Sequence, residues 1–594
     1  MAVIGFDFGT TNSLVSIIRG NRPISFLDEL DLPTPSVVCY EGSQTIVGRD
    51  AKSRLSEAGL GVKGNIVPSP KTLLGRETVD VEGIARSPIE IASEVVKHVI
   101  ERAKGSDRGK DIAGTTSAVV TIPVNMEGYR RAALRDAFRR AGLRIHQFVH
   151  EPLAALYGQL RDQGRYDDML RQYNRQLLLV VDWGGGTLDI TLCRLVDGVL
   201  FQIANDGTDL VGGEQFDDAI RNEVRDRVIL QRGLVAAEPV RVDAMTRLRH
   251  SCESAKIALS ERDSAAVYVR SFFRNLDDDS LDYTLTRDEL ERIVTPLMNQ
   301  GLRRITGLLE RNEVTPAQIG LCLAVGGMAN MPAIRTRLHE WFGVQRVHVS
   351  RKSASLIAEG AAWIAHDNAR LQLSKTVELL LARNSFVPII RTGTEMPLEN
   401  QTRTTESMHL YCVDPRDGIA KFQVQTPQRP GVVHSGDPRR VLKVMTIPVD
   451  SKARPFQERL ELDAEIDENL ILSLRARSLN KRGMDEAQIH DLEFSLRLPG
   501  GTDTASVFEE TPGSTQAPQS AKGALAVRAN VGGTEDDALV PGELLYTYKP
   551  RALDPEWHPP QIQMDEFLYY QPCSYCRRAS NDPLCRCASS PASP

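Results

Sequence analysis

The sequence predicts an α/β domain of two lobes, followed by an antiparallel β-sandwich domain and a flexible Cys-rich tail. Residues 1 to about 370 alternate short apolar runs with amphipathic segments, which is the pattern of α/β units. From about 375 to 500, short strand-like runs are broken by polar turns, which is typical of antiparallel sheets. A motif of strand, Asp and glycine turn occurs at 3–11 and again at 179–187, and two copies suggest two related lobes that face each other across a cleft.

The same changes of pattern place the domain boundaries. We assign 1–370 to the α/β domain, 371–376 to a linker and 377–500 to the β domain. Residues 501–535 are rich in Gly, Thr, Ser, Ala and Pro, which is typical of a flexible tether. The last part, 536–594, contains aromatic residues and a dense Cys cluster.

Individual elements follow from the local apolar spacing. In the α/β domain we predict strands at 117–123 and 177–181 and a helix at 126–141. In the β domain the candidate strands lie at 409–413, 419–425, 441–449, 470–474 and 492–498.

The composition excludes several classes of protein. The chain has 594 residues, 41% of them hydrophobic and 25% charged, and Lys plus Arg (72) nearly balance Asp plus Glu (78). No global field therefore attracts nucleic acid or an anionic membrane, and no apolar run approaches the roughly 20 residues of a transmembrane helix. The first residues lack the features of a secretory signal, and five of the nine Cys are scattered, as in a reducing cytosol. We expect a multidomain cytoplasmic protein.

The two repeats contain residues suited to a metal–nucleotide. Glycines let backbone N–H groups approach a phosphate, and the hydroxyls of Thr10 and Thr11 add donors. An Asp at each strand end, Asp7 and Asp182, can hold the water shell of Mg²⁺. The alternative is a pair of ordinary hairpins in which Asp and Gly only make turns.

Two further glycine turns occur, at Gly212-Gly213 before Glu214 and at Gly326-Gly327. A phosphate-binding P-loop is excluded, because the nearest candidate, at 105–110, is one residue short and is followed by Asp111 instead of a hydroxyl residue. No dinucleotide-binding glycine pattern follows a strand either.

From these residues the chain is identified as resembling the 70-kDa heat-shock (DnaK-type) chaperone family, within the actin and sugar-kinase superfamily. The resemblance runs in family order over about 370 residues, and the segments that carry it are 4–13, 71–76, 119–123, 151–155, 182–189, 212–217, 252–260 and 325–327. It implies an actin-like ATPase fold with ATP or ADP and Mg²⁺ as cofactors. Beyond 370 the best match is 462–469.

The resemblance also implies roles for individual residues. Asp7, Asp182 and Asp189 would hold Mg²⁺ mostly through water, and the catalytic set would be Lys71, Glu151, Asp182 and Thr187. Lys71 would stabilise charge at the γ-phosphate, and Glu151 would organise the outer sphere of the metal. The nucleotide-binding set would be Gly9, Thr10, Thr11, Asn12, Gly184, Gly185, Gly186, Thr187, Gly212, Gly213, Glu214, Glu253, Lys256, Ser260, Gly326 and Gly327. Glu253, Lys256 and Ser260 have the spacing of one helix face, which in the family meets adenosine.

Some positions depart from the family pattern. The two arginines that usually sandwich adenine are replaced by Ile257 and Asn330, which predicts altered nucleotide selectivity. Pro123 and Arg131 match the pair that relays the nucleotide state to the substrate domain. The linker has no unbroken leucine run, and the residues at 146–150 differ from those that dock J-domain partners, so a J-domain partner is left open.

After 500 no long amphipathic helix appears, so the helical lid of the family is absent from the pattern. Instead, Cys573, Cys576, Cys585 and Cys587 have a spacing that can close a Zn²⁺ site. A reduced tail, redox-active thiols and lipidated cysteines are the alternatives. The tail is also a candidate for recruiting a dedicated protein partner.

Three functions are compatible with these observations. The leading hypothesis is a slow, lidless chaperone-like ATPase whose β domain binds unfolded or extended polypeptide. A second is an ATP-sensing scaffold or switch with little hydrolysis that assembles a dedicated partner complex. A third is a small-molecule kinase of the same superfamily, which Lys71 and the appended β domain disfavour.

Overall fold

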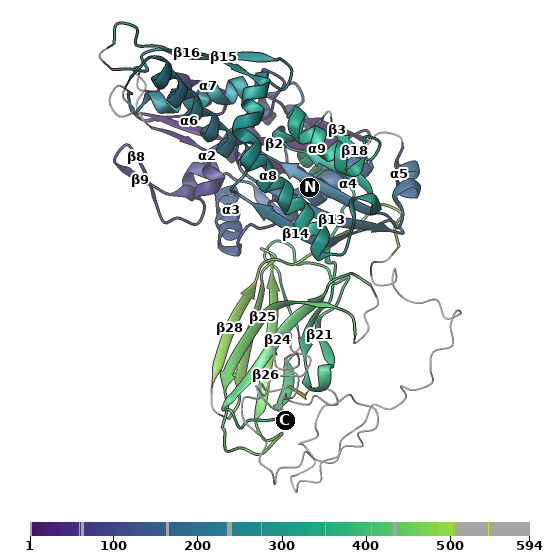
Figure 1. Cartoon of the computed structure of the whole chain (residues 1–594). Coiled ribbons are helices and arrows are strands. Elements are labelled where there is room, and N and C mark those ends of the chain that lie inside the picture. Colours follow the sequence, from purple (N-terminus) through teal and green to yellow (C-terminus); the bar gives the residue numbers. More distant parts are fainter. Residues whose placement is uncertain are drawn as a thin grey trace, which may run out of the picture.

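The computed structural model describes residues 3–502 except for short gaps, together with 504 and 544–545. The gaps are 59, 61–64, 162–164, 235–239, 275, 351, 406, 432–435 and 481–482. Figure 1 shows the α/β part, purple to teal, above the green β domain. The tether, the tail and the four cysteines Cys573, Cys576, Cys585 and Cys587 lie outside the described residues, so the Zn²⁺ hypothesis stays untested.

Lobe I is built on a sheet in the order β11-β10-β1-β2-β3, with β4 paired to β2. Its strands are β1 (Val3–Phe8), β2 (Asn12–Arg19), β3 (Arg22–Ser25), β4 (Thr34–Pro35), β10 (Ser117–Ile122) and β11 (Arg144–His150). Its main helices are α2 (Pro88–Gly105), α3 (Gly128–Arg140), α4 (Glu151–Arg161) and α10 (Leu356–His366). Smaller elements are β5 (Val37–Glu41), β6 (Gln44–Val47), β7 (Ile66–Pro68), β8 (Val79–Val81), β9 (Ile84–Arg86), α1 (Arg49–Ser53) and α5 (Tyr166–Tyr173).

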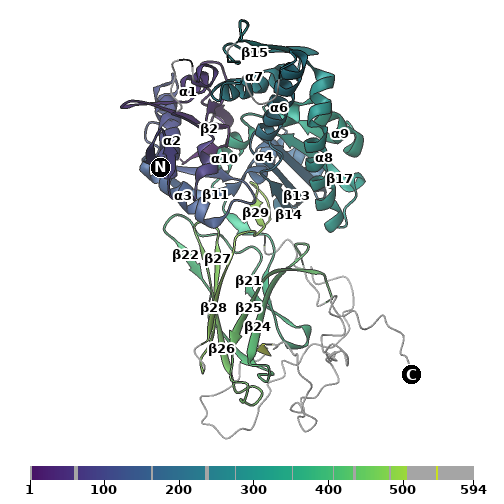
Figure 2. The same cartoon turned by 60° about the vertical axis from the view of Figure 1, so that its left-hand side comes forward.

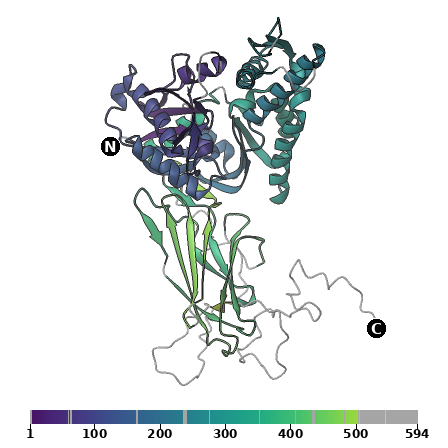
Figure 3. The same ribbon diagram turned by 90° about the vertical axis from the view of Figure 1, so that its left-hand side faces the viewer.

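Lobe II is built on a seven-stranded sheet in the order β18-β17-β12-β13-β14-β29-β19. The strands from within the α/β domain are β12 (Leu177–Trp183), β13 (Leu188–Val196), β14 (Val199–Thr208), β17 (Ile319–Val325) and β18 (Val347–Val349). The helices are α6 (Gly213–Gln231), α7 (Ala244–Ala258), α8 (Arg287–Arg311) and α9 (Pro332–Phe342), beside the hairpin of β15 (Ser264–Val269) and β16 (Leu281–Thr286). Figure 3 shows the two lobes side by side above the β domain.

The two lobes repeat one topology. In each, an antiparallel meander (β1-β2-β3 or β12-β13-β14) is extended on its first strand by two parallel strands (β10 and β11, or β17 and β18). Helices α4 and α10 pack where the lobes join, and the backbones approach so closely that a Cβ on Gly360 would lie 1.8 Å from the Ala154 carbonyl oxygen. The prediction of two related lobes is thereby confirmed.

The β domain contains two sheets (Figure 2). Their strands pair antiparallel, except that β30 (Leu544–Leu545) runs parallel to β23 (Met408–Cys412). One has the order β21-β20-β24-β25, from β20 (Val377–Leu380), β21 (Phe386–Ile390), β24 (Ile419–Pro427) and β25 (Arg439–Pro448). The other has the order β28-β27-β26-β23-β30, with β22 paired to β26. Its strands are β22 (Thr402–Thr404), β23 (Met408–Cys412), β26 (Arg459–Asp467), β27 (Leu472–Ser478), β28 (Met484–Ile489) and β30 (Leu544–Leu545). Alternate residues along β26 and β27 are buried, as in a sheet with one face on a core.

Two expectations about the domain connection need correction. The run at 492–498, which we assigned to the β domain, forms β29 (Phe494–Arg497), and this strand pairs with β14 of lobe II. The expected linker, 371–376, begins with β19 (Leu371–Leu373), which pairs with β29 and so extends the sheet of lobe II before the chain reaches the β domain. The buried faces of both strands, with Leu371 and Leu496 about 1% and 0% exposed, explain why they join a sheet.

The chain therefore enters and leaves the β domain at the sheet of lobe II. After β29, a Cβ on Gly198 would lie only 2.5 Å from Gly501 Cα, so the two backbones touch there. Thr502 then donates a hydrogen bond from its backbone N to the carbonyl oxygen of Asp197 (3.0 Å). No helix among the described residues is long and apolar enough to cross a membrane.

Candidate functional site

Three predicted glycine turns meet between the lobes. Gly185 and Gly186, between β12 and β13, lie so close to Thr11 and Thr10 that an added Cβ would come within 2.0 Å and 2.5 Å of their side chains. The backbone N of Glu214 donates to the Gly185 carbonyl oxygen (2.7 Å), which brings the start of α6 against the same turn. The structure thus gathers the loops at 9–12, 184–187 and 212–214 into one place.

The fourth turn flanks the same place from β17. Gly326 has a φ of +81°, and a Cβ there would lie 2.4 Å from the Trp183 carbonyl oxygen and 2.7 Å from Asp182 Oδ1. Only glycine tolerates both conditions. At Gly327 no atom would lie within 4 Å of an added Cβ, so its backbone faces open space that a ligand can enter.

Four carboxyl groups and one lysine form a buried cluster behind these turns, which we call the acid cluster: Asp7, Glu151, Asp182, Asp189 and Lys71. Lys71 Nζ donates to Glu151 Oε1 at 2.7 Å, with both side chains less than a tenth exposed. Asp7 is the penultimate residue of β1 and accepts a hydrogen bond from Thr121 Oγ1 (2.7 Å). Asp189 Oδ1 accepts from the backbone N of Val124 (3.0 Å). All four predicted catalytic or metal-binding carboxylates are therefore brought together.

The electrostatics of the acid cluster show an excess of negative charge. Burial, and then the charge of Glu151, raise the pKa of Asp7 and of Asp189 to about 7, although Lys71 lowers both. The same two causes raise the pKa of Asp182 well above its usual value. Each carboxyl group thus disfavours ionisation of its neighbours, because the single lysine does not balance them.

The carboxylate oxygens of the acid cluster are suitable ligands for a hydrated divalent cation. Asp189 Oδ2 is buried without a hydrogen-bond partner among the described residues, although burying an unpaired carboxylate oxygen is costly. No three His, Cys, Asp or Glu side chains in the described part of the chain are grouped as direct ligands of one ion. Mg²⁺ keeps several of its waters and so needs few direct carboxylates.

The predicted adenosine face is only partly as expected. Lys256, on α7, lies 2.8 Å from Asp217 Oδ1 and donates to the Gly213 carbonyl oxygen (3.0 Å). Glu253 accepts from Lys52 Nζ of α1 (2.6 Å), so this pair joins the lobes. Ser260, however, lies beyond the last residue of α7, Ala258, and does not continue the helix face.

The sequence reasoning gave no role to several residues at the site. Thr121, Lys52 and Asp217 contact predicted residues, and Ser69 Oγ donates to Glu214 Oε1 (2.5 Å) across the lobes. A hydroxyl near the end of a buried strand and an acid one turn into α6 are the local signals for Thr121 and Asp217. Nothing local marks Lys52 or Ser69, because their partners are distant in sequence.

The positions of the missing arginines are open to solvent. Ile257 is 60% exposed, which is unusual for an isoleucine on a helix beside a polar turn. Asn330 is also exposed, and its amide donates weakly to the Gly327 carbonyl oxygen and to Ser353 Oγ, both at 3.4 Å.

The contact between lobe I and the β domain is carried by α3. Arg131 is fully buried and donates to the carbonyl oxygens of Asn469 (3.2 Å), Leu470 (3.3 Å) and His490 (2.9 Å). Arg135 donates to the side-chain oxygen Oδ1 of Asn469 (2.9 Å) and to the backbone carbonyl oxygen of Glu468 (2.7 Å). The matched residue Arg131 thus contacts the β domain directly.

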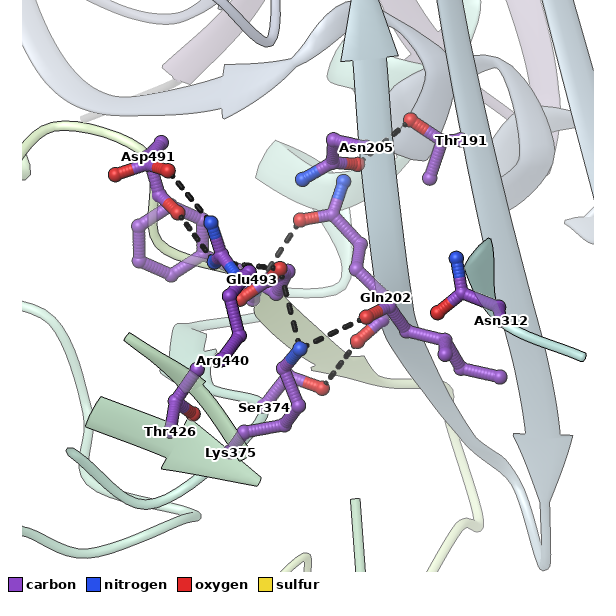
Figure 4. Close-up of polar contacts among 12 residues, drawn as sticks. Thr191, Gln202, Asn205, Asn312, Ser374, Lys375, Thr426, Arg440, Asp491 and Glu493 are labelled. Carbon is purple, nitrogen blue, oxygen red and sulfur yellow. Dashed lines mark hydrogen bonds and ion pairs between the residues drawn. The ribbon is translucent and has the colours of Figure 1, made fainter. Parts of the chain in front are cut away.

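The contact with lobe II is an ion network around the linker (Figure 4). Lys375 Nζ lies 3.1 Å from Glu493 Oε1 and donates to the Ile203 carbonyl oxygen (2.9 Å). Arg440 of β25 also pairs with Glu493 (2.9 Å). Ser374 Oγ donates to the Gln202 carbonyl oxygen (2.6 Å), so the linker is fixed on β14.

Comparison with known proteins decides the family. A family model described as "Hsp70 protein" matches residues 3–381, more than half of the chain. The chain belongs to the Hsp70 family. The Hsp70 assignment agrees with the two-lobed fold and with the four glycine turns around the acid cluster.

Individual relatives agree. The chain is 31% identical over 471 residues to proteins named chaperone protein HscA homolog from Burkholderia pseudomallei and Burkholderia mallei, covering 71% of each chain. It is 31% identical over 336 residues to the chaperone protein DnaK of Mycoplasma mycoides, covering 56% of this chain and 54% of that one.

Proposed function

We propose that the protein is an ATP-dependent chaperone that hydrolyses ATP slowly with Mg²⁺ and couples hydrolysis to the binding of extended polypeptide. The observation that carries this proposal is the acid cluster, which lies directly behind the converging glycine turns. Bound Mg²⁺ would supply charge neutralisation at the phosphates.

The residues of this chain would divide the work. The backbone N–H groups and hydroxyls of 9–12 and 184–187 would hold the phosphates, and Asp7, Asp182 and Asp189 would hold the metal through its waters. Lys71 is fixed by Glu151 at 2.7 Å, so its ammonium would stabilise charge that develops on the transferred phosphate.

The β domain offers an edge for a peptide. Strand β21 (Phe386–Ile390) is the end strand of its sheet, and three of its five residues are half-exposed. An extended peptide adds to such an edge through main-chain hydrogen bonds, and the side-chain pockets supply preference. Here we interpret the two sheets as a β-sandwich that binds polypeptide.

Single-turnover hydrolysis of ATP tests the proposal. With Mg²⁺, Lys71→Ala should reduce the rate by about 10²–10³, as does the loss of one preorganised charge-stabilising group. Lys97→Ala is the matched control, because Lys97 is exposed on α2 and should leave the rate unchanged. Hydrolysis by wild type that does not depend on Lys71 would contradict the proposed role.

The second candidate is an ATP-sensing scaffold with little hydrolysis. It is favoured by the replacement of the adenine arginines by exposed Ile257 and Asn330 and by the polar linker residues Ser374 and Lys375. Binding of ATP without Lys71-dependent turnover would support it. Phosphorylation of a sugar or a carboxylic acid would instead support the kinase alternative.

A further inference from the structure

A second cavity lies away from the acid cluster, where lobe II meets the β domain. Its volume is about 500 Å³. It is bounded by β12 and β13, by the turn that follows α8, and by the loop after β24. The lining residues used below are Arg175, Arg194, Arg346, Arg429, Glu313 and Asn312.

The lining of this cavity is strongly positive. Four of its residues are arginines, and Glu313 is the one acid among the lining residues that the structure describes. Arg346 Nη1 donates to the carbonyl oxygens of Ala317 (2.7 Å) and Ile319 (3.2 Å), which fixes its guanidinium. A guanidinium has five N–H donors, so these contacts leave further donors for a ligand.

We propose that this cavity binds a small polyanion that carries phosphate groups. Planar guanidinium forks match phosphate oxygens in pairs, and a volume of about 500 Å³ lies within the usual range for small-molecule sites. The site is distinct from the proposed nucleotide site, because none of the residues around the glycine turns lines this cavity.

Both domains contribute to the lining of the cavity, most of it from lobe II. Arg175, Arg194 and Arg346 belong to lobe II, whereas Arg429 comes from the β domain and donates to the Asn312 carbonyl oxygen (3.4 Å). Arg429 also lies 3.6 Å from Glu313 Oε2 of lobe II, so docking forms an ion pair within a lining in which four arginines accompany one described acid. An anion would neutralise the positive charge that remains. A ligand that binds the docked state better shifts the population toward it. Ile203, the carbonyl partner of Lys375, also lines the cavity and connects it to the linker.

Calorimetric titration of the full chain with inorganic pyrophosphate, without Mg²⁺, tests the site. Arg194→Gln and Arg429→Gln should each weaken binding about tenfold or more, because each removes charge-assisted hydrogen bonds. Arg139→Gln is the control: Arg139 is 72% exposed on α3 and does not line the cavity, so binding should stay within about twofold.

Hydrogen exchange on the same samples tests the coupling. Saturating pyrophosphate should slow exchange at β19 in the wild type but not in Arg429→Gln. Equal binding by all variants would place pyrophosphate elsewhere, for example at the glycine turns, and would overturn the proposal. A lack of saturable binding would also overturn the proposal. The same holds if pyrophosphate still slows hydrogen exchange at β19 in Arg429→Gln.

Discussion

The acid cluster and the interdomain contact treat buried charge in opposite ways. In the acid cluster four carboxyl groups share one lysine, and the pKa of Asp7 and Asp189 rises to about 7 because burial and Glu151 disfavour their ionised forms. At the interdomain contact, Arg131 has three backbone acceptors in the β domain and Lys375 has a carboxylate and a carbonyl. The cluster holds more negative charge than Lys71 balances, whereas Arg131 and Lys375 at the contact have acceptors from the chain itself. Even so, Gln202 Nε2 and His490 Nδ1 are buried at the contact without a hydrogen-bond partner among the described residues.

This difference indicates which buried charges lower the free energy of unfolding and which raise it. Buried polar groups stabilise a structure when all are paired and destabilise it when some are not. The acid cluster should therefore destabilise the fold until a cation binds to it. The interdomain contact should hold the two domains together without any ligand.

The largest effect is expected from Arg131→Ala, which tests the contact. It leaves the carbonyl oxygens of Asn469, Leu470 and His490 without their donor, and each buried unpaired acceptor costs about 1–3 kcal/mol, so we expect the free energy of docking to weaken by about 3–5 kcal/mol. Hydrogen exchange at β19 and β29 measures this loss. Arg139→Ala on the same helix is 72% exposed and should change nothing; an equal effect of both substitutions would refute the comparison.

A smaller loss, about 2–3 kcal/mol, is expected for Lys375→Met. It leaves Glu493, whose side chain is 7% exposed, with Arg440 as its remaining partner. Adding Glu493→Gln should cost less in the Lys375→Met background than in the wild type, because the Lys375–Glu493 pair is already lost there. Denaturant titration of the wild type, the two single variants and the double variant gives the coupling energy, and strict additivity would contradict a direct Lys375–Glu493 interaction.

In the acid cluster, the removal of a charged group should stabilise the protein instead of destabilising it. Asp189→Asn removes one of the mutually repelling carboxylates, so the ligand-free protein should gain about 1–2 kcal/mol of stability at pH 8. The same variant should lose the extra stability that Mg²⁺ and ATP give the wild type. Thermal unfolding with and without both ligands checks the two effects, and destabilisation of the ligand-free variant would show that the cluster is balanced.

The smallest effect concerns the pair that joins the lobes. Burial raises the pKa of Glu253, but the hydrogen bond of His250 and the charge of Lys52 outweigh it and lower the pKa to about 2. A lowered pKa gives stability that is present above about pH 4.5 and is lost as the pH falls toward 2. Glu253→Gln should therefore cost about 1 kcal/mol at pH 7, roughly half of that at pH 3 and little near pH 2, as followed by denaturant unfolding at the three values.

The sequence predicted the acid cluster better than the interdomain contact, because the cluster is built from local motifs and the contact is not. Asp7 and Thr11 lie in one short strand and turn whose chemistry is local, and the repeat at Asp182 doubles the signal. By contrast, the run at 492–498 alternates like the strands of the β domain, and nothing local tells which sheet it joins. The pairing of Arg131 with Leu470 likewise joins residues far apart in sequence, which no spacing reveals.

Ser260 shows that the end of a helix is hard to predict from spacing alone. The i, i+3, i+7 spacing from Glu253 assumes that the helix continues, but α7 ends at Ala258 and β15 begins at Ser264. No glycine or proline marks this end in the sequence, so tertiary packing decides it.

The close approach of Gly198 to Gly501 determines where the rest of the chain starts. Thr502 is hydrogen-bonded to Asp197 of lobe II, whereas Leu544 and Leu545 pair with β23 of the β domain. The chain after β29 is therefore attached once to each domain. Separation of the two domains would draw these two attachments apart, unless β29 left lobe II together with the β domain or β30 left β23.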